Sequence, residues 1–396
     1  MTTYLAVLRT PGALRFALPG LVGRLPMGML SLAIVMLVAA TTGRYGLAGA
    51  VSAVGALAYA AVTPQVARLV DRYGQRRVLR PQAVVFGAAA VALAACALGH
   101  TPVWTLFAAG GLTRAAMPPL GSMVRARWSH ALADRSLRQQ AFSLEAIADE
   151  LIFIGGPVLV VALVGAAGPV YGVLGCVGLG VAGVLAFCAA RRTEPLPARQ
   201  GRAAGGALRS PGLLVHIGMH LFLGAMFSAV DLATVAFAAG QGRPGAAGPI
   251  LAAYGVGSAV GGVWYGSRRF RAALPNRLAV ALAATVLPTA LLVLAPGVWW
   301  LTAAIFVAGL GISATLICSY TIVESIVPAT CRTEGMTWLS TAAAIGTALG
   351  APVGGHLVDA YGATAGYLFA FGAGVAALGL LLACRPRLVT LVAAAT

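Results

Sequence analysis

Twelve long apolar stretches constrain the fold of this chain more than any other feature. Each is long enough to cross a hydrocarbon core of roughly 30 Å, which takes about 20 helical residues. Helices are predicted because a backbone in lipid must satisfy its own hydrogen bonds, and because these runs are roughly twice the length of a barrel strand. The approximate spans are residues 14–40, 47–67, 81–100, 103–124, 140–166, 169–190, 212–239, 248–267, 278–296, 299–323, 335–359 and 364–384.

The composition agrees with this interpretation. Hydrophobic residues make up 60% of the 396 residues, charged residues only 9%, and the mean hydropathy is +0.90. These values lie far outside the range of soluble proteins. The sequence therefore predicts an all-α polytopic membrane protein.

The distribution of arginine predicts the orientation of the spans. All 27 basic residues are arginine, and with 10 acidic residues they give a net charge of +17. Of these arginines, 23 lie near the chain ends or in loops that follow even-numbered spans, whereas Arg44 and Arg243 lie in the opposite loops. The positive-inside rule then places both termini in the cytoplasm. We attribute the charge to topology and to anionic lipids of the cytoplasmic leaflet, and expect no nucleic-acid partner.

The chain repeats itself at about half its length. The segment GLAGAVSAVGALAYA (46–60) aligns with GPILAAYGVGSAVGG (248–262), and IGGPVLV in the fifth span resembles LGAPVGG in the eleventh. Chance similarity between glycine-rich and alanine-rich helices is the weaker explanation, because the spans divide six and six and the loop charges match. We expect two pseudo-symmetric six-helix bundles, residues 1–190 and 212–396, joined by a cytoplasmic linker at 191–211.

The loop after the second span resembles a family motif. The stretch ARLVDRYGQRR is similar to the pattern G-x-x-x-D-R-x-G-R-[RK] of the major facilitator superfamily, with Ala67 and Gln75 as departures. The departure at Ala67 weakens close helix packing but leaves the charged part intact. The matching positions are Asp71, Arg72, Gly74, Arg76 and Arg77.

Two patterns of proton antiporters in this superfamily are half present. Gly156 and Pro157 match the fifth-helix pattern G-P-x-x-G-G, but valines replace its last two glycines. Arg114 matches a fourth-helix arginine, with Pro118 where glycine is usual. The stretches GRLPMGM, LEAIADEL and RTEGMTW are similar to those of actinobacterial transporters. The resemblance covers the whole chain and implies a secondary transporter whose two halves open alternately to each side of the membrane.

The resemblance also implies a gate on the cytoplasmic side. Asp71 is similar to the family aspartate that caps the start of the eleventh helix, near Thr333. A carboxylate at a helix N-terminus contributes roughly 0.3–1 kcal/mol, little enough to be broken in every cycle. The alternative is that these charges only fix topology. The predicted gating residues are Asp71, Arg72, Gly74, Arg76, Arg77, Glu324, Arg332 and Glu334.

Five charged residues are predicted to lie inside the first half. Arg24, Arg114 and Asp149 each lie roughly 15 Å from the cytoplasmic boundary if the spans are straight helices, with Glu145 and Glu150 beside Asp149. A lone charge there costs about 2.5–3.5 kcal/mol, so they are expected to pair or to face water. One hypothesis is proton coupling, chiefly at Asp149, with Glu150 the better structural partner. The other is a permanent salt-bridge network.

The second half has fewer buried charges. Asp231 is its only acid well inside a span, and is interpreted as a substrate contact or an outer gate; alternatively, it faces water at the membrane edge. His216 and His220 are four residues apart, which permits a metal site on one helix face, but no carboxylate or cysteine lies at ligand spacing. We therefore predict no metal and no cofactor.

These observations favour a transporter over an enzyme. Motifs for a nucleophile with its base, for metal ligands or for nucleotide binding are not found in the sequence. We predict a monomer in the bacterial cytoplasmic membrane that exports a small organic molecule in exchange for protons. The alternative is a proton-coupled importer or facilitator of a sugar, an amino acid or an organic anion, with Arg24 and Arg114 as the anion site.

Overall fold

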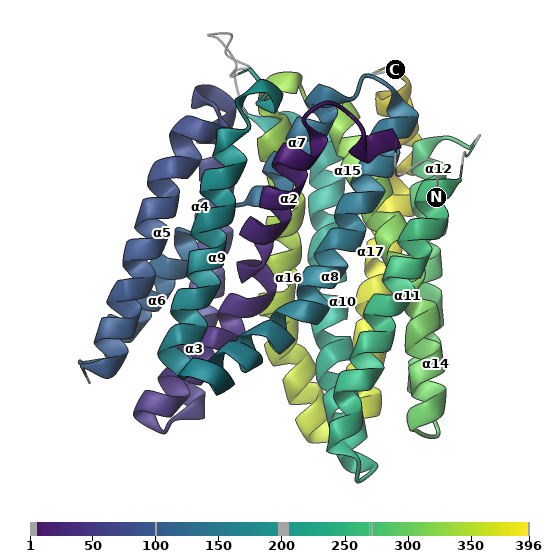
Figure 1. Cartoon of the computed structure of the whole chain (residues 1–396). Coiled ribbons are helices and arrows are strands. Elements are labelled where there is room, and N and C mark those ends of the chain that lie inside the picture. Colours follow the sequence, from purple (N-terminus) through teal and green to yellow (C-terminus); the bar gives the residue numbers. More distant parts are fainter. Residues whose placement is uncertain (1–5, 100, 197–205, 269, 271, 395–396) are drawn as a thin grey trace.

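The computed structural model describes residues 6–99, 101–196, 206–268, 270 and 272–394, and in these ranges the regular structure is helical. The first eight helices are α2 (Ala13–Arg24), α3 (Pro26–Thr42), α4 (Tyr45–Tyr73), α5 (Gln75–Leu98), α6 (Val103–Ala115), α7 (Leu120–Ala131), α8 (Arg135–Ala167) and α9 (Pro169–Ala189). The second series is α10 (Pro211–Gly240), α11 (Ala247–Ser267), α12 (Leu274–Val286), α13 (Ala290–Val293), α14 (Val298–Gly309), α15 (Ile312–Ile326), α16 (Arg332–Tyr361) and α17 (Ala363–Ala394) (Figure 1).

Each expected span corresponds to one helix or to consecutive helices. Over the described residues, ten helical segments are long and apolar enough to cross a membrane. The two other expected spans are α11, which is rich in glycine, and the pair α6 and α7. The all-helical fold predicted from the apolar stretches is thus confirmed.

Prolines explain most of the interruptions. Pro26 begins α3, Pro118 and Pro119 separate α6 from α7, and Pro288 lies in the short 3-10 helix between α12 and α13. Proline lacks a backbone N–H and its ring clashes with the preceding turn. Two other prolines of the expected spans, Pro157 and Pro352, lie inside the continuous helices α8 and α16.

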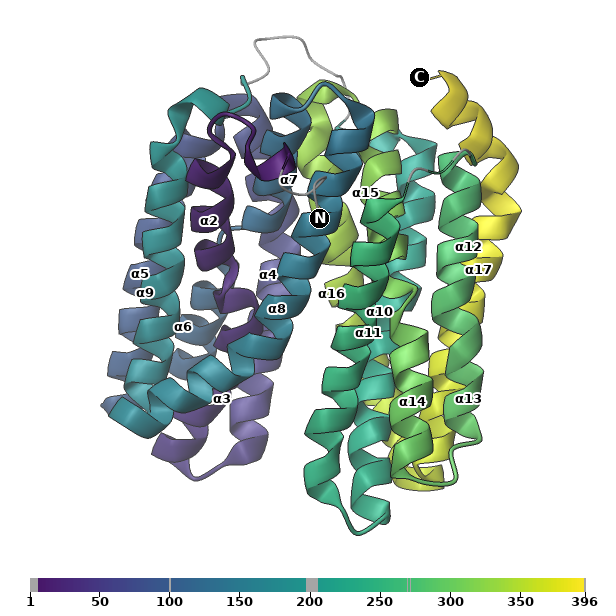
Figure 2. The same ribbon diagram turned by 45° about the vertical axis from the view of Figure 1, so that its right-hand side comes forward.

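The helices form two bundles (Figure 2). The elements up to α9 gather in one bundle and most of α10–α17 in the other, and α8 and α16 lie at the junction. Contacts join α4 to α16, α7 to α16, and α8 to both α11 and α15. Of the expected linker, residues 197–205 lie outside the described ranges; the short 3-10 helices Arg191–Thr193 and Ala207–Arg209 flank that gap.

Glycine allows helices to approach closely. A Cβ on Gly156 would lie 2.8 Å from the carbonyl carbon of Gly28, and one on Gly183 would overlap the backbone of Gly23. These contacts join α8 to α3 and α9 to α2. Lipid tails provide no hydrophobic drive between helices, so backbone contact of this kind supplies much of the attraction.

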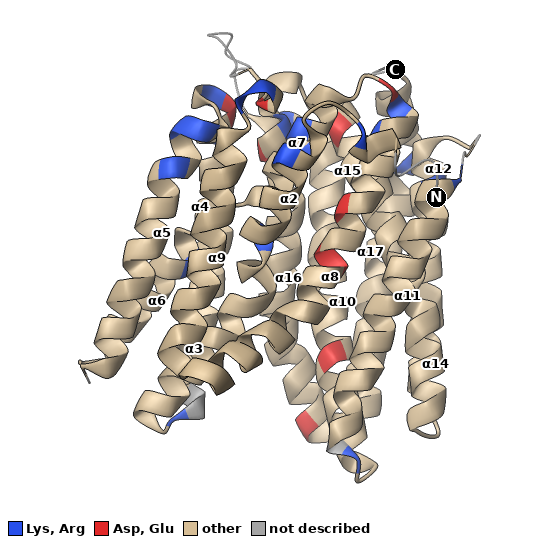
Figure 3. Cartoon of the chain, in the orientation of Figure 1, with Lys and Arg blue, Asp and Glu red and all other residues tan. Residues whose placement is uncertain are grey.

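The charged residues are distributed unevenly along the bundle axis. Arginines gather at the end where α2 begins and α17 ends, whereas acidic residues also occur along the helices (Figure 3). We call this the arginine-rich end. At this end the residue before α8 is Asp134, whose carboxylate accepts hydrogen bonds from the backbone amides of Ser136 and Leu137 at 2.6 and 3.1 Å. That cap satisfies two amides that the first helical turn leaves free.

Candidate functional site

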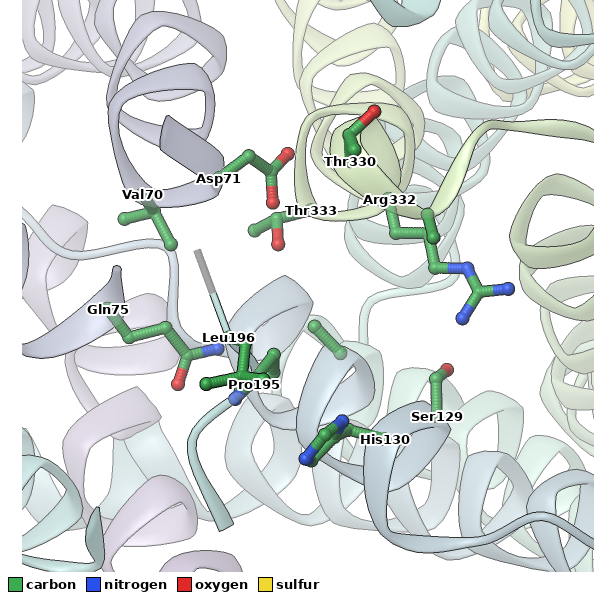
Figure 4. A pocket seen from close by; sticks show the side chains of 12 residues that line it. Val70, Asp71, Gln75, Ser129, His130, Pro195, Leu196, Thr330, Arg332 and Thr333 are labelled. Atoms are coloured by element: carbon green, nitrogen blue, oxygen red, sulfur yellow. The ribbon is translucent and has the colours of Figure 1, made fainter. Parts of the chain in front are cut away.

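At the arginine-rich end, the last turn of α4 contacts the first turn of α16. The Oδ2 atom of Asp71 accepts a hydrogen bond of 2.9 Å from the backbone amide of Glu334, and Figure 4 shows the carboxylate directed at Thr333. This is the helix start near which the family resemblance placed the aspartate. The backbone reverses at Gly74, whose φ of +92° few other residues adopt, so that α5 can begin directly after α4.

Glu334 extends this contact into a network. Glu334 is 2% exposed, and its carboxylate lies 2.7 Å from Nε of Arg68. Arg68 is not among the gating residues predicted from the sequence. The other oxygen accepts a hydrogen bond of 3.2 Å from the backbone amide of Ala207, beside the linker. One carboxylate thereby joins α4, α16 and the chain segment between the halves.

A second set of contacts lies near the start of α8. Nη1 of Arg138 is 2.7 Å from Oε1 of Glu324 at the end of α15, and Arg332 approaches the same oxygen at 3.4 Å. Nearby, Thr337 of α16 donates to Ser122 of α7 at 2.7 Å. The two halves are therefore held together at the arginine-rich end by charged and polar groups from α4, α7 and α8 of the first half and from α15 and α16 of the second.

The remaining motif residues have other surroundings. Arg72 and Arg77 are exposed, and the backbone amide of Arg76 donates to Glu194 at 2.9 Å. Gln75 replaces the common arginine for a visible reason: its amide oxygen accepts a hydrogen bond of 2.7 Å from the fully buried Arg127. A second guanidinium at this position would repel the first.

Deeper in the first half, two arginines hold two acids. Arg24 forms ion pairs with Glu145 at 2.5 Å and with Asp149 at 2.8 Å, and Arg125 pairs with the other oxygen of Asp149 at 2.7 Å. Trp128 donates to Glu145 at 2.7 Å. The Asp149 side chain is 20% exposed, whereas both arginines are almost fully buried. We call Arg24, Arg125, Glu145 and Asp149 the ion cluster.

Arg125 connects the ion cluster to the second half. Its guanidinium carbon lies 4.2 Å from the ring centroid of Tyr320 in α15, a cation–π contact. Arg125 is one of the 23 arginines that were expected near the chain ends or in loops. The error arises because the fourth span does not end near residue 124: α7 restarts the helix after Pro119 and carries Arg125 and Arg127 into the protein interior.

Arg114, which was expected at the same depth as Arg24 and Asp149, is in none of the ion pairs of the described residues. Arg114 lies at the end of α6, before the proline interruption, 5.7 Å from the ring centroid of Tyr59. It is 8% exposed, and its Nε and Nη1 atoms are buried without a hydrogen-bond partner. Counting depth along a straight helix ignored the change of helix direction that two successive prolines allow.

Glu150 is also separate from the ion cluster, because it points away from Asp149 toward the second half. Ser258 of α11 donates to its Oε1 at 2.6 Å, and Ser258 lies 2.9 Å from Ser313 of α15. Glu150 thus takes part in a contact between the two halves. Asp231 of α10 is exposed and lies about 14 Å, nine helical residues, from the end of that helix.

The two histidines do not assemble a metal site. His216 and His220 direct their Nδ1 atoms at backbone carbonyls of their own helix, at 2.8 and 2.9 Å. Within the described ranges, no group of three or more histidine, cysteine or acidic side chains is placed to hold a metal ion.

Comparison with known proteins identifies the family. The model of the Major Facilitator Superfamily matches residues 18–287 and 221–393. This chain belongs to the major facilitator superfamily. It is a multi-pass membrane transporter and not an enzyme. The comparison with curated proteins gives no match.

Solved structures of major facilitator transporters share this fold. A bacterial homologue of the iron transporter ferroportin, in an outward-facing state, has a TM-score of 0.77 at 13% identity, covering 94% of this chain and 98% of that one. The Escherichia coli fucose:proton symporter FucP has a TM-score of 0.73 at 14% identity, with coverage of 94% and 98%. The human organic anion transporter MFSD10 has a TM-score of 0.64 at 16% identity, with coverage of 96% and 97%.

In this superfamily member a pocket of about 400 Å³ lies between the halves at the arginine-rich end (Figure 4). Its lining includes Asp71, Gln75 and His130 from the first half and Arg332 and Thr333 from the second. The pocket adjoins the contacts that close this end, so it lies outside the ion cluster and the Glu150 contact.

Proposed function

We propose that this protein is a proton-coupled exporter of a small organic molecule that works by alternating access in a bacterial cytoplasmic membrane. The arginine-rich end is assigned to the cytoplasm, since positively charged loops are retained on that side. The contacts of Asp71, Glu334, Arg138 and Glu324 then form the cytoplasmic gate, closed in this structure. The half-present antiporter patterns support export over import.

The observation that carries the proposal is the position of Asp149. Its carboxylate is shared by Arg24 and Arg125, and Arg125 also lies on Tyr320 of the second half. Protonation of Asp149 would remove two ion pairs at once and leave Arg125 free to move. A proton at this site thereby changes a contact between the halves, which is what coupling requires.

The closed gate contains weak parts that a transport cycle can separate. Arg68 is 40% exposed in its side chain, and exposed ion pairs contribute roughly 0–1 kcal/mol. The helix-cap contact of Asp71 is of similar size. The free energy of one binding or protonation event is sufficient to break several such contacts, because each contributes little when water can replace it.

A second candidate function is import of an organic anion. It is favoured by Arg114, whose buried guanidinium has unpartnered N–H groups, whereas Arg24 is already neutralised by two acids. In this second candidate function, Arg114 alone binds the anion, and Arg24 does not take part.

Proton flux in vesicles tests the proposal. Purified protein is reconstituted with an internal pH dye, and a panel of aromatic amines, sugars and organic acids is added to wild type, Asp149→Asn and Asp359→Asn. Asp359 is exposed on α16 and serves as the control for the lost charge. We expect substrate-driven proton flux in wild type and control, and none in Asp149→Asn. Equal flux in all three would exclude Asp149 as the coupling site.

The direction of transport requires a second measurement on the same vesicles. A substrate found in the panel is loaded inside or outside, and an imposed pH gradient is used to drive its accumulation. Counter-movement of substrate and protons supports export by exchange. Movement in the same direction would overturn it in favour of the importer.

A further inference from the structure

Glu150 of α8 and Asp231 of α10 form no ion pair with an arginine of the described residues. Among the described residues, the ion pairs use Glu145, Asp149, Glu324 and Glu334, with Glu150 and Asp231 in none of them. This is unexpected in a chain with 27 arginines and 10 acids. An ionised carboxylate deep in a membrane protein needs a cation or water beside it.

Aromatic rings lie between these two acids. Phe227 precedes Asp231 by one turn on α10, so the two side chains share a face of the helix. The ring of Phe227 packs edge-on against Tyr254 of α11, with centroids 6.1 Å apart. Gly255 follows Tyr254 along the chain, and a Cβ there would lie 3.5 Å from Oε2 of Glu150. Tyr254 therefore contacts the ring that lies one turn before Asp231, and its chain neighbour Gly255 lies close to Glu150.

The hydroxyl of Tyr254 points to a missing ligand. The residue is only 8% exposed, yet its hydroxyl oxygen is buried without a hydrogen-bond partner. Buried polar groups are nearly always hydrogen-bonded, because leaving one unpaired costs about 1–3 kcal/mol. The hydroxyl is close enough to Glu150 and Asp231 to interact electrostatically with both carboxylates. A donor or acceptor that occupies the space between them would satisfy it.

We propose that Glu150, Asp231, Phe227 and Tyr254 form a binding site for an organic cation with an apolar, aromatic body. The carboxylates neutralise the ammonium group, and the rings add cation–π attraction and apolar contact. The site takes Glu150 from the first half and the other three residues from the second, near the middle of the membrane, where superfamily substrates are bound. The inference rests on the proposed function and names its substrate class.

Equilibrium binding of two matched probes tests this inference. The probes are 1-naphthylmethylammonium and 1-naphthoate, which carry the same ring system and opposite charges. Calorimetric titration of the detergent-purified full chain compares wild type with Glu150→Gln, Asp231→Asn and Tyr254→Phe, with Asp359→Asn as the matched loss of one charge. Each variant is first checked for a wild-type elution volume.

The expected result is binding of the ammonium probe in wild type and in Asp359→Asn. Neutralising either acid should weaken it about tenfold or more, and Tyr254→Phe about three- to tenfold. Equal affinity in Asp231→Asn and wild type would overturn the proposal. Binding of naphthoate in place of the ammonium probe would overturn it as well, and would direct attention to Arg114.

The assay separates this inference from the proposed function. Binding is measured without a membrane or a pH gradient, so it does not depend on proton coupling at Asp149. If Asp149→Asn leaves proton flux intact while the ammonium probe still requires Asp231, the coupling proposal fails and the cation site stands. If Asp149→Asn abolishes proton flux while the ammonium probe binds Asp231→Asn as it binds wild type, the cation site fails and the coupling proposal stands.

Discussion

The guanidinium of Arg125 stacks on the ring of Tyr320, 4.2 Å from its centroid, and also forms an ion pair with Asp149. One cation of the first half is thus shared between the proposed proton acceptor and an aromatic ring of the second half. Because Arg125 is almost fully buried, its contact with Tyr320 is not weakened by water.

Removal of the Tyr320 ring should favour opening of the arginine-rich end. In Tyr320→Leu the cation–π contact, worth about 0.5–2 kcal/mol, is lost, so the open population should rise roughly two- to thirtyfold. Tyr320→Phe keeps the ring and should resemble wild type. Spin labels at the exposed positions Arg135 and Arg387, in a background without native cysteines, report the distance between the halves. Identical distance distributions in both variants would show that the stacking contributes nothing to closure.

Loss of the Asp71 charge should loosen the same end by a smaller amount. Asp71→Asn keeps the size of the side chain but weakens its interaction with the α16 N-terminus by roughly 0.3–1 kcal/mol. The same spin-label pair should show an open population about two- to fivefold larger. Arg72→Gln, which changes an exposed neighbour, is the control. If the open population rises more in Arg72→Gln than in Asp71→Asn, closure of this end depends on net charge and not on the Asp71 contact.

A guanidinium at position 75 should destabilise the protein. Gln75→Arg faces the buried Arg127 and also removes the amide that donates to the carbonyl of Met123 at 3.1 Å. We expect a loss of about 1–3 kcal/mol, seen as a lower midpoint of thermal unfolding in detergent. The double variant Gln75→Arg, Arg127→Gln should recover part of the lost stability, because the two side chains contact each other. A double variant as unstable as the sum of the singles would argue against direct repulsion.

Two adjacent glycines should respond differently to alanine. A Cβ on Gly156 meets the backbone of Gly28, which cannot move without shifting α3, whereas a Cβ on Gly155 meets nothing within 4 Å. Gly156→Ala should cost about 1–3 kcal/mol through overpacking. Gly155→Ala should be neutral or stabilising by up to about 1 kcal/mol, since alanine favours helix. Thermal unfolding of the two variants side by side measures the difference, and equal midpoints would contradict the close helix contact.

Much of the candidate gate followed from the sequence, and so did three of the four residues of the ion cluster. The resemblance of ARLVDRYGQRR to a superfamily motif placed Asp71 near Thr333, and the hydrogen bond to Glu334 lies one residue away. Arg24, Glu145 and Asp149 were selected because isolated charges stand out in apolar stretches. Arg125 was missed because it follows an apolar stretch, as the loop arginines do. The end of an apolar stretch does not show whether the helix also ends there.

The sequence by itself determined the class of structure and the course of the helices. Apolar length requires spanning helices, because lipid offers no hydrogen bonds to the backbone, and the arginine pattern predicts their orientation. Only the tertiary structure decided which charges meet. The pairing of charges depends on helix rotation and on interruptions such as Pro118–Pro119. In this fold Arg125 forms an ion pair with Asp149, whereas Arg114 lies beside Tyr59. Such angles arise from packing between helices that are distant in the chain, so no local pattern records them.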